Sequence, residues 1–288
     1  GVRRLGVARP LRRDHPCGQR QRRRRYHAAD RPPPPPGSAP WRGSSPTGAA
    51  PLWKKWNHKS VVQSHAATQL VVQGAEMQPG MHVLDLASGT GEPSLSLAKA
   101  VGSAGRVVAT DLVPEMLEAA RENARAQGLS QMEFRVADAE HLPFQAGEFD
   151  RVTCRFGLMF FPDVQKALGE IRRVLKPGGR VSFLVWGPLE ENPLFSVTFS
   201  PFLKHVQLPA PPPDAPGVFR FADHAKLAAA LAATGFRNVA TARHTVLPAS
   251  SGNNSGNRPI FSRYSAAVAA SMRRLASTTS TLLGPMAM

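Results

Sequence analysis

The densest group of residues able to do chemistry follows a short apolar run at residues 81–87, where the chain continues Ser-Gly-Thr-Gly-Glu. A run of this length, with Pro-Gly before it and glycines after it, is typical of a strand buried on both faces. Gly89 and Gly91 allow the backbone to turn sharply and to approach a ligand without a Cβ in the way. Asp111 ends the next apolar run, where a carboxylate can accept hydrogen bonds from both hydroxyls of a ribose. The pattern predicts a site for a cofactor that contains a nucleoside.

Two kinds of cofactor bind at such turns, the nicotinamide dinucleotides and S-adenosylmethionine. A dinucleotide motif has a third glycine, which lets the following helix pack closely and a pyrophosphate lie on its N-terminus, but Ser94 stands at that position. Asp85 and Glu92 also bracket the turn with negative charge. This charge repels a pyrophosphate and suits the α-ammonium of a methionine moiety, directly or through water. The residues therefore favour S-adenosylmethionine.

Such a site requires strands that end at one edge of a sheet, and strand and helix signals alternate along the chain after one or two helices in residues 53–72. The alternation predicts an α/β fold, a Rossmann-like, doubly wound and mostly parallel sheet with helices on both faces. The predicted strands are residues 81–87, 106–110, 132–136, 149–156, 180–186 and 237–247, and the predicted helices that follow them are residues 93–101, 114–127, 164–175 and 223–234.

Several motifs together resemble a known family. They are Val-Leu-Asp-Leu-Ala-Ser-Gly-Thr-Gly-Glu at residues 83–92, Ala109-Thr110-Asp111-Leu112, Asp138-Ala139-Glu140, Phe149-Asp150 and Leu175-Lys-Pro-Gly-Gly. Over residues 53–247 the chain resembles the class I S-adenosylmethionine-dependent methyltransferases, in the branch of ubiquinone and menaquinone biosynthesis.

The resemblance implies where the cofactor lies. It places Asp85, Gly89 and Gly91 around the methionine part, and Asp111 and Leu112 at the ribose and the adenine. The end of the fourth strand is where the acceptor and the transferred methyl group should meet. The residues expected to bind the cofactor are Asp85, Ala87, Gly89, Gly91, Asp111, Leu112, Met116, Asp138, Ala139 and Cys154.

Some of these residues also have ordinary structural uses. Asp138 is a common type of helix N-cap, and a methionine at helical spacing, such as Met116, is often a core residue. We expect Cys154 to be a buried small side chain and not a nucleophile, because methyl transfer needs no covalent enzyme intermediate.

The sequence identifies no catalytic residue with certainty, but it offers three candidates. Arg155, at the end of the fourth predicted strand, either binds an anionic or carbonyl acceptor or pairs with a nearby carboxylate. His58 and His65 either serve as a general base or are surface residues. We expect no metal site, since the two cysteines, Cys17 and Cys154, belong to no Cys/His cluster.

The positive charge of the chain is concentrated at its ends. The net charge is +16, of which residues 1–50 carry +10 and residues 51–190 carry zero. A neutral central part argues against a nucleic-acid partner. The chain also lacks an apolar stretch of membrane-spanning length and the apolar core of a signal peptide, so we expect a cytoplasmic protein. The oligomeric state does not follow from the sequence.

The composition divides the chain into three segments. We expect residues 1–50 to be an Arg/Pro-rich disordered segment, residues 51–248 to be the methyltransferase domain, and residues 249–288 to be a low-complexity, disordered tail. The family usually ends with a seventh strand inserted antiparallel beside the sixth, and no convincing partner follows Leu247. The last strand is therefore expected to be missing. Ends of this kind also arise from frame-shifted or fragmentary coding sequence.

The function expected from the resemblance is methyl transfer from S-adenosylmethionine to a small, apolar or ring-containing acceptor by in-line displacement. Two alternatives stay open. The chain could be a noncatalytic or degenerate S-adenosylmethionine-binding protein, or a methyltransferase that acts on protein or RNA.

Overall fold

The computed structural model describes residues 65–192, 195, 205, 212, 214–246 and 264–269. All of them belong to one unit, residues 39–288. The predictions for residues 1–50, for His58 and for the first part of the N-terminal helix concern residues outside this described set.

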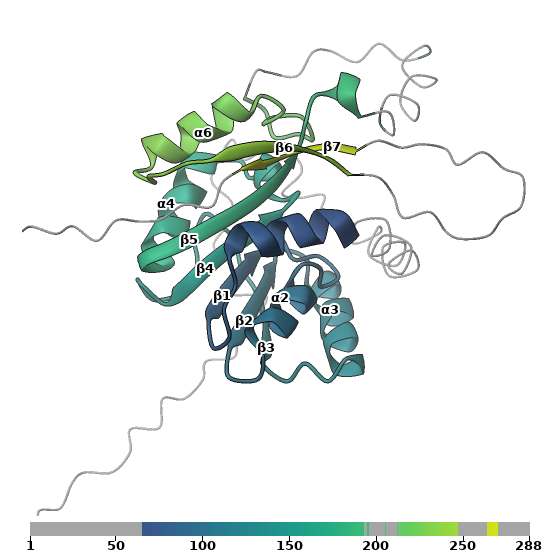
Figure 1. Ribbon diagram of the computed structural model, residues 1–288, viewed down its shortest axis with the longest axis vertical. Helices are drawn as coiled ribbons and strands as arrows, with labels where there is room; N and C mark the ends of the chain where they lie inside the picture. The colour runs from purple at the N-terminus through teal and green to yellow at the C-terminus, as the bar shows by residue number, and fades with distance from the viewer. Residues whose placement is uncertain are drawn as a thin grey trace, which may run out of the picture. The chain divides into compact units, whose positions relative to one another are not determined.

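Seven strands of the described chain form one sheet in the order β3-β2-β1-β4-β5-β7-β6. The strands from β3 to β5 in this order are parallel neighbours, whereas β7 runs antiparallel to both β5 and β6. Figure 1 shows helices on either side of the sheet, which confirms the predicted doubly wound α/β fold. The strands are β1 (His82–Leu86), β2 (Arg106–Asp111), β3 (Met132–Val136), β4 (Phe149–Arg155), β5 (Leu175–Trp186), β6 (Thr241–Val246) and β7 (Tyr264–Ala269).

The helices divide between the two faces of the sheet. Successive residues of a strand point to opposite faces, so Val83 packs with α2 and α3, while Leu84 packs with α4 and α6. A further helix, residues 65–75, lies over β5 on the face of α2. None of the described helices is long and apolar enough to cross a lipid bilayer. The helices that follow strands lie within their predicted ranges: α2 (Ser94–Val101), α3 (Pro114–Ala126), α4 (Val164–Val174) and α6 (His224–Ala233).

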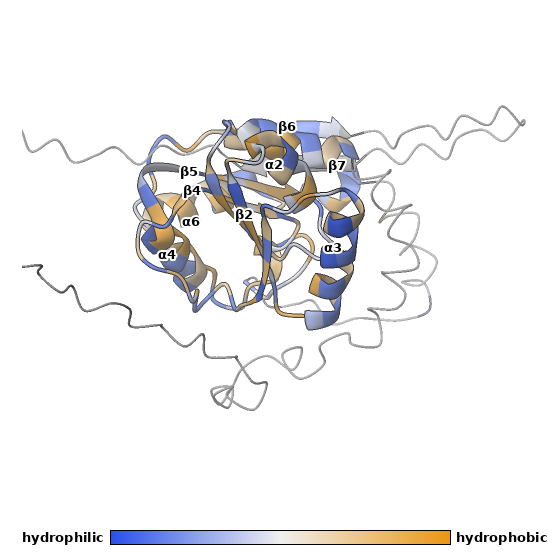
Figure 2. Ribbon diagram, turned by 90° about the horizontal axis from the view of Figure 1, so that it is seen from below, coloured by the Kyte–Doolittle hydropathy of each residue, from blue (hydrophilic) through white to orange (hydrophobic). Residues whose placement is uncertain are grey.

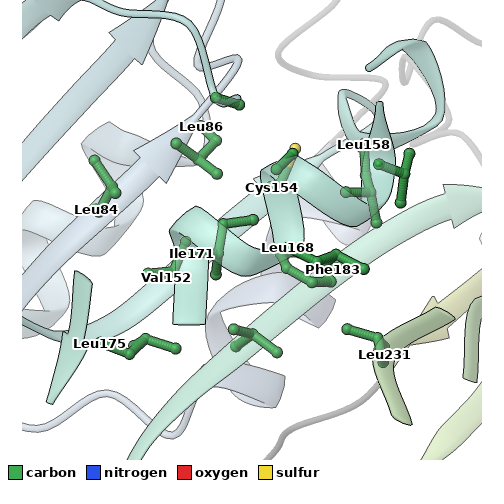
Figure 3. Close-up of a cluster of buried hydrophobic side chains, with 14 of the residues drawn as sticks. Leu84, Leu86, Val152, Cys154, Leu158, Leu168, Ile171, Leu175, Phe183 and Leu231 are labelled. Carbon is green, nitrogen blue, oxygen red and sulfur yellow. The ribbon is translucent and has the colours of Figure 1, made fainter. Parts of the chain in front are cut away.

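The larger apolar cluster lies between the sheet and the pair α4 and α6. Leu84, Val152 and Phe183 contribute from neighbouring strands, and Ile171 and Leu231 contribute from the two helices (Figure 3). All five are fully buried, and burial of a side chain of this size contributes about 1.5–3 kcal/mol. In Figure 2 the middle of the sheet is mainly orange, whereas β6 is blue to white and α3 carries both blue and orange. The cluster holds β1, β4 and β5 in place from one face.

The opposite face is partly polar where the helix of residues 65–75 packs. The Ser182 hydroxyl donates to the carbonyl oxygen of Val71 at 3.0 Å, and Arg151 Nε donates to the carbonyl oxygen of Ala75 at 2.6 Å. Carbonyl groups in the last turn of a helix lack partners within the helix. Arg151 supplies such a partner to Ala75, and Ser182 adds a second bond to Val71, so the helix has a defined position on the sheet.

β5 begins earlier than predicted, at Leu175 instead of residue 180. Leu175 pairs with Phe149, and the ladder resumes between Arg180 and Arg151 after a shift of register. The Lys-Pro-Gly-Gly segment therefore ends α4 as predicted but forms an irregularity inside the strand. Proline and glycine are tolerated in strands at such bulges.

The predicted absence of the last strand is wrong. Residues 264–269 form β7, which lies between β5 and β6 and pairs Ala266 with both Trp186 and His244. The segment Tyr-Ser-Ala-Ala-Val-Ala has weak strand propensity because alanine is depleted in strands. It forms a strand because two neighbouring strands, distant in sequence, offer it hydrogen-bonding partners on both sides. The rest of the predicted disordered tail lies outside the described residues.

A chain that ends at residue 248 lacks β7 and leaves β6 without its neighbour. We expect it to lose more than about 3 kcal/mol of unfolding free energy, because two ladders of hydrogen bonds worth about 1 kcal/mol each are removed. Urea unfolding followed by circular dichroism measures this loss. A chain that ends at residue 275 keeps β7 and should unfold like the full chain. Equal stability of all three forms would show that β7 contributes nothing.

Candidate functional site

Four polar side chains lie near the carboxyl ends of adjacent parallel strands. Asp85 is in β1, Asp111 ends β2, Asp138 follows β3 and Arg155 ends β4. The order β3-β2-β1-β4 places these ends along one edge of the sheet. The fold thus brings the residues predicted from the motifs to the edge at which open α/β sheets bind ligands.

The turn between β1 and α2 is bent by residues in the left-handed conformation. The angle φ is +51° at Ala87, +54° at Gly89 and +119° at Gly91. A Cβ added to Gly91 would lie 3.2 Å from Leu95 Cδ1, whereas one added to Gly89 would meet nothing within 4 Å. Gly91 therefore permits close packing of α2, and the space beside Gly89 is open to a ligand.

Asp85 is a fully buried carboxyl group whose two oxygens are both held by hydroxyl groups. Ser94 Oγ donates to Oδ2, and Thr153 Oγ1 donates to Oδ1 at 2.7 Å. Ser94 occupies the position at which a dinucleotide-binding motif has its third glycine. In this structure its hydroxyl group orients the carboxyl group of Asp85. Asp85 thereby joins β1 to α2 and to β4.

Burial raises the pKa of Asp85 to about 6, although the two hydroxyl bonds and the positive charge of Arg155 act in the opposite direction. The group is therefore mostly ionised at neutral pH. None of the ion pairs of the described residues includes Asp85. A buried carboxylate of this kind favours a cation near it.

Asp111 connects the end of β2 to the glycine turn. The backbone N–H of Gly89 donates to Oδ2 and the backbone N–H of Val113 donates to Oδ1, both at 2.9 Å. Burial raises the pKa of Asp111 against the effect of these bonds. Because a carboxylate has about four lone-pair sites, Asp111 can also accept hydrogen bonds from ligand hydroxyls.

Apolar side chains are exposed on the same side as Asp111. Leu112 is 45% exposed, and Val136, the last residue of β3, is 36% exposed. Met116 is half-buried in α3, and Ala139 is buried after β3. A flat apolar ring bound beside Asp111 would cover the exposed side chains.

Asp138 has a local structural use that differs from a helix cap. Its Oδ1 accepts a hydrogen bond from the N–H of Glu140 at 2.9 Å, which is the geometry of an aspartate-stabilised turn. The next element of the chain, fully described here, is β4 and not a helix. The interpretation of Asp138 as a helix cap is therefore wrong, although its carboxyl group does accept a hydrogen bond from the backbone N–H of Glu140.

The turn after β4 lies against the turn after β1. Phe156 has a φ of +58°, and a Cβ added to Gly157 would lie 2.5 Å from Ala87 Cβ and 2.7 Å from Cys154 Sγ. Cys154 belongs to the larger apolar cluster, and its burial raises the pKa of the thiol. This agrees with its interpretation as a buried small side chain and disfavours the thiolate form.

Arg155 links the glycine turn to the helix of residues 65–75. Its Nη1 donates to Thr68 Oγ1 at 2.8 Å, and its Nη2 donates to the backbone oxygen of Glu92 at 3.0 Å. Burial lowers the pKa of Arg155, while the charges of Glu92 and Asp85 oppose this effect. Within the described residues Arg155 thus bonds neutral oxygens and forms no direct ion pair.

Aromatic side chains form a row from the end of β4 to the end of β5 and beyond, which we call the aromatic row (Phe156, Trp186, Phe195 and Phe219). The rings of Phe156 and Trp186 stack with centroids 4.3 Å apart and planes 7° apart. Trp186 meets Phe195 edge to face at 4.9 Å, and Phe195 meets Phe219 in the same way at 5.3 Å. The row adds an aromatic surface to the edge that carries Arg155.

The structure adds no support for His58 or His65 as a general base. His65 is exposed in the helix of residues 65–75, which agrees with its interpretation as a surface residue. His58 lies outside the described residues.

Sequence reasoning missed several residues of this edge. Ser94 could have been found, since it occupies the position of the missing third glycine. Thr153 could not have been found, because it meets Asp85 only through the register in which β1 and β4 pair. Val136 and Trp186 end predicted strands. The sequence does not show that Val136 stays exposed or that Trp186 stacks on Phe156, because both depend on the folded structure.

The sheet order, the glycine turn and the acidic strand ends are those of a class I S-adenosylmethionine-dependent methyltransferase domain. A sequence profile described as the ubiE/COQ5 methyltransferase family matches residues 54–210, more than half of the chain. The chain belongs to this family, which confirms the resemblance found in its motifs.

Individual relatives match over a shorter range. The ubiquinone/menaquinone biosynthesis C-methyltransferase UbiE of Burkholderia cenocepacia is 42% identical over 134 residues, which are 45% of this chain and 55% of that protein. An uncharacterized protein of Mycobacterium tuberculosis is 41% identical over 117 residues, 41% of each chain. The chain therefore matches only about half of the length of these relatives.

Solved structures share the fold at low sequence identity. The YcgJ protein of Bacillus subtilis superposes with a TM-score of 0.54 at 22% identity, over 74% of this chain and all of that one. The [4+2]-cyclase SpnF superposes with a TM-score of 0.51 at 20% identity, over 73% of this chain and 82% of that one. Because these structures include a cyclase, the fold alone does not determine the reaction.

The raised pKa of Asp85 predicts how Asp85→Asn changes stability with pH. Ionisation of Asp85 costs the folded state more than the unfolded state, so the wild-type protein loses stability as pH rises from about 4 through about 6. The variant lacks this loss, and its stability relative to wild type should rise by up to about 3 kcal/mol between pH 4 and pH 8. Urea unfolding at both pH values measures the change.

Asp150→Asn is the matched control. Despite burial, hydrogen bonds from Lys176 and from the N–H of His82 keep the pKa of Asp150 below its usual value. The relative stability of this variant should therefore fall as pH rises. A rise for both variants, or for neither, would contradict the assignment.

Proposed function

We propose that this protein transfers a methyl group from S-adenosylmethionine to a small, apolar or ring-containing acceptor. The observation that carries the proposal is the open space at Gly89, in a turn flanked by the buried carboxyl group of Asp85 and the half-buried carboxyl group of Asp111. One carboxylate suits an ammonium group, and the other suits ribose hydroxyls. A pyrophosphate would be repelled by both.

The proposed cofactor position follows from charge and shape. The methionine part lies along the glycine turn with its ammonium group toward Asp85, the ribose lies on Asp111, and the adenine covers Leu112 and Val136. Exposure of these two apolar side chains supports the adenine position. The other residues that we propose as contacts are Ala87, Gly89, Gly91, Met116, Asp138, Ala139 and Cys154.

When bound, S-adenosylmethionine supplies an electrophilic methyl group, which bonds to a nucleophilic atom of the acceptor as the carbon–sulfur bond breaks. The protein's residues contribute alignment and exclude water. The glycine turn and the two carboxyl groups hold the donor, and the aromatic row lies where an acceptor would approach it. Cys154 supplies no nucleophile, since its burial raises the pKa of the thiol.

The aromatic row supports an apolar or ring-containing acceptor. A flat ring can stack on an aromatic face or meet it edge to face, with a gain beyond simple burial. The stacked pair Phe156 and Trp186 stands beside the turn after β1, because Phe156 precedes Gly157, whose backbone contacts Ala87. An acceptor on this surface would therefore lie close to the donor.

Two other functions use parts of the same site. A noncatalytic S-adenosylmethionine-binding protein would need the glycine turn but no acceptor surface, and the aromatic row favours the transferase. Methylation of protein or RNA would need a large polar or basic surface, whereas residues 51–190 carry no net charge. A small-molecule acceptor and a cytoplasmic location stay predictions.

Calorimetric titration tests the cofactor. We expect the protein to bind S-adenosylmethionine and S-adenosylhomocysteine and not NAD. Asp111→Asn should weaken S-adenosylmethionine binding at least about 10-fold, because hydrogen bonds to a charged acceptor contribute about 1.5–3 kcal/mol. Asp150→Asn, at the opposite edge of the sheet, is the control and should bind like wild type. Absence of binding, or preference for NAD, would overturn the proposal.

Methyl transfer from labelled S-adenosylmethionine to quinols, phenols and other small metabolites tests the acceptor. With a ring-containing acceptor, Trp186→Ala should raise KM at least about 10-fold through loss of buried aromatic surface, and cofactor affinity should change less than about twofold. Phe134→Ala, which removes a half-buried ring from β3, should leave both constants unchanged. Equal loss with ring-free acceptors would show that Trp186 has no role in acceptor choice.

A further inference from the structure

Arg155 is half-buried at the carboxyl end of β4, and its guanidinium lacks a full set of partners. It donates to Thr68 Oγ1 and to the Glu92 carbonyl oxygen, and its Nε is buried and has no acceptor within hydrogen-bonding distance. An unsatisfied buried donor on a charged group is costly and uncommon. The site therefore lacks an acceptor atom that a ligand can supply.

The nearby carboxylates do not supply this atom. Both oxygens of Asp85 accept bonds from hydroxyl groups, and Oε2 of Glu92 accepts a bond from Ser96 Oγ at 2.8 Å. They attract Arg155 through space but do not bond it. A partly buried positive charge without a bonded anion is unfavourable by itself and is stabilised when an anion binds it.

We propose that Arg155 binds the α-carboxylate of the methionine part of S-adenosylmethionine. The inference rests on the proposed function, since it assigns a contact within that cofactor site. Arginine presents its N–H groups as a fork that matches a carboxylate, and Nε is one arm of this fork.

The position of Arg155 favours the cofactor over the acceptor as the source of this carboxylate. Its Nη2 bonds the carbonyl oxygen of Glu92, the residue that follows Gly91, so the guanidinium lies beside the turn that holds the methionine part. Thr153 and Arg155 share one face of β4, and Thr153 bonds Asp85. One negative and one positive group thus stand side by side, matching the ammonium and carboxylate of an amino acid.

Decarboxylated S-adenosylmethionine provides the decisive comparison, because it lacks only the carboxylate. For Arg155→Met we expect binding of S-adenosylmethionine to weaken about 10- to 100-fold, while binding of the decarboxylated compound changes less than about twofold. Arg155→Lys keeps the charge but loses the fork and should fall between wild type and the methionine variant. Calorimetric titration gives all affinities, and thermal unfolding shows that each variant is folded.

Thr68→Val is the matched control for a purely structural role. It removes the bond between Arg155 and the helix of residues 65–75 but leaves the guanidinium in place. Any change in affinity should be equal for the two ligands. If Arg155 were only a brace, Arg155→Met would also weaken both ligands equally, and the inference would be overturned.

Two further outcomes are distinguishable from this one. If Arg155→Met leaves both cofactor affinities unchanged and raises only the KM of the acceptor, Arg155 binds the acceptor and the inference is wrong, while the proposed function stands. If the wild-type protein binds neither cofactor compound, the proposed function fails together with the inference.

Discussion

The structure of the ligand edge depends on one buried carboxylate, that of Asp85. Its oxygens accept from Ser94 at the start of α2 and from Thr153 in β4, so one side chain sets the position of a helix and of a neighbouring strand relative to β1. Burial of this charge is unfavourable, as its raised pKa shows. A group buried at such a cost, at the edge where open α/β sheets bind ligands, is consistent with the ligand role proposed for Asp85.

The remainder of the edge is built around that carboxylate by backbone geometry. Residues with a left-handed backbone follow both β1 and β4. The turn after β4 can lie against Ala87 in the turn after β1 because Gly157 has no Cβ. Asp111 then holds the glycine turn from the other side through the N–H of Gly89. The turns after β1, β2 and β4 are therefore joined by direct contacts, although they come from different strands.

The sequence was sufficient for features whose signal is local. The strand before Gly89, the helices α2, α3, α4 and α6, and the acidic strand ends all lie where the patterns predict them, since apolar periodicity and turn residues act over short distances. Features decided by pairing between distant segments were not predictable. Thr153 meets Asp85 only through the register of β4, and β7 was missed because its alanines and serine indicate no strand until β5 and β6 flank them.

The insertion of β7 between β5 and β6 has a consequence for how the protein is made. A ribosome releases the chain from its N-terminus, so β5 and β6 emerge before the strand that separates them in the sheet. Until β7 arrives, β5 presents an unpaired edge, the kind of surface on which strands of other chains dock. The pairing of β7 with β5 joins segments far apart in the sequence, and such long-range pairing is slow compared with local structure. Until that pairing is made, the unpaired edge of β5 favours association with other chains.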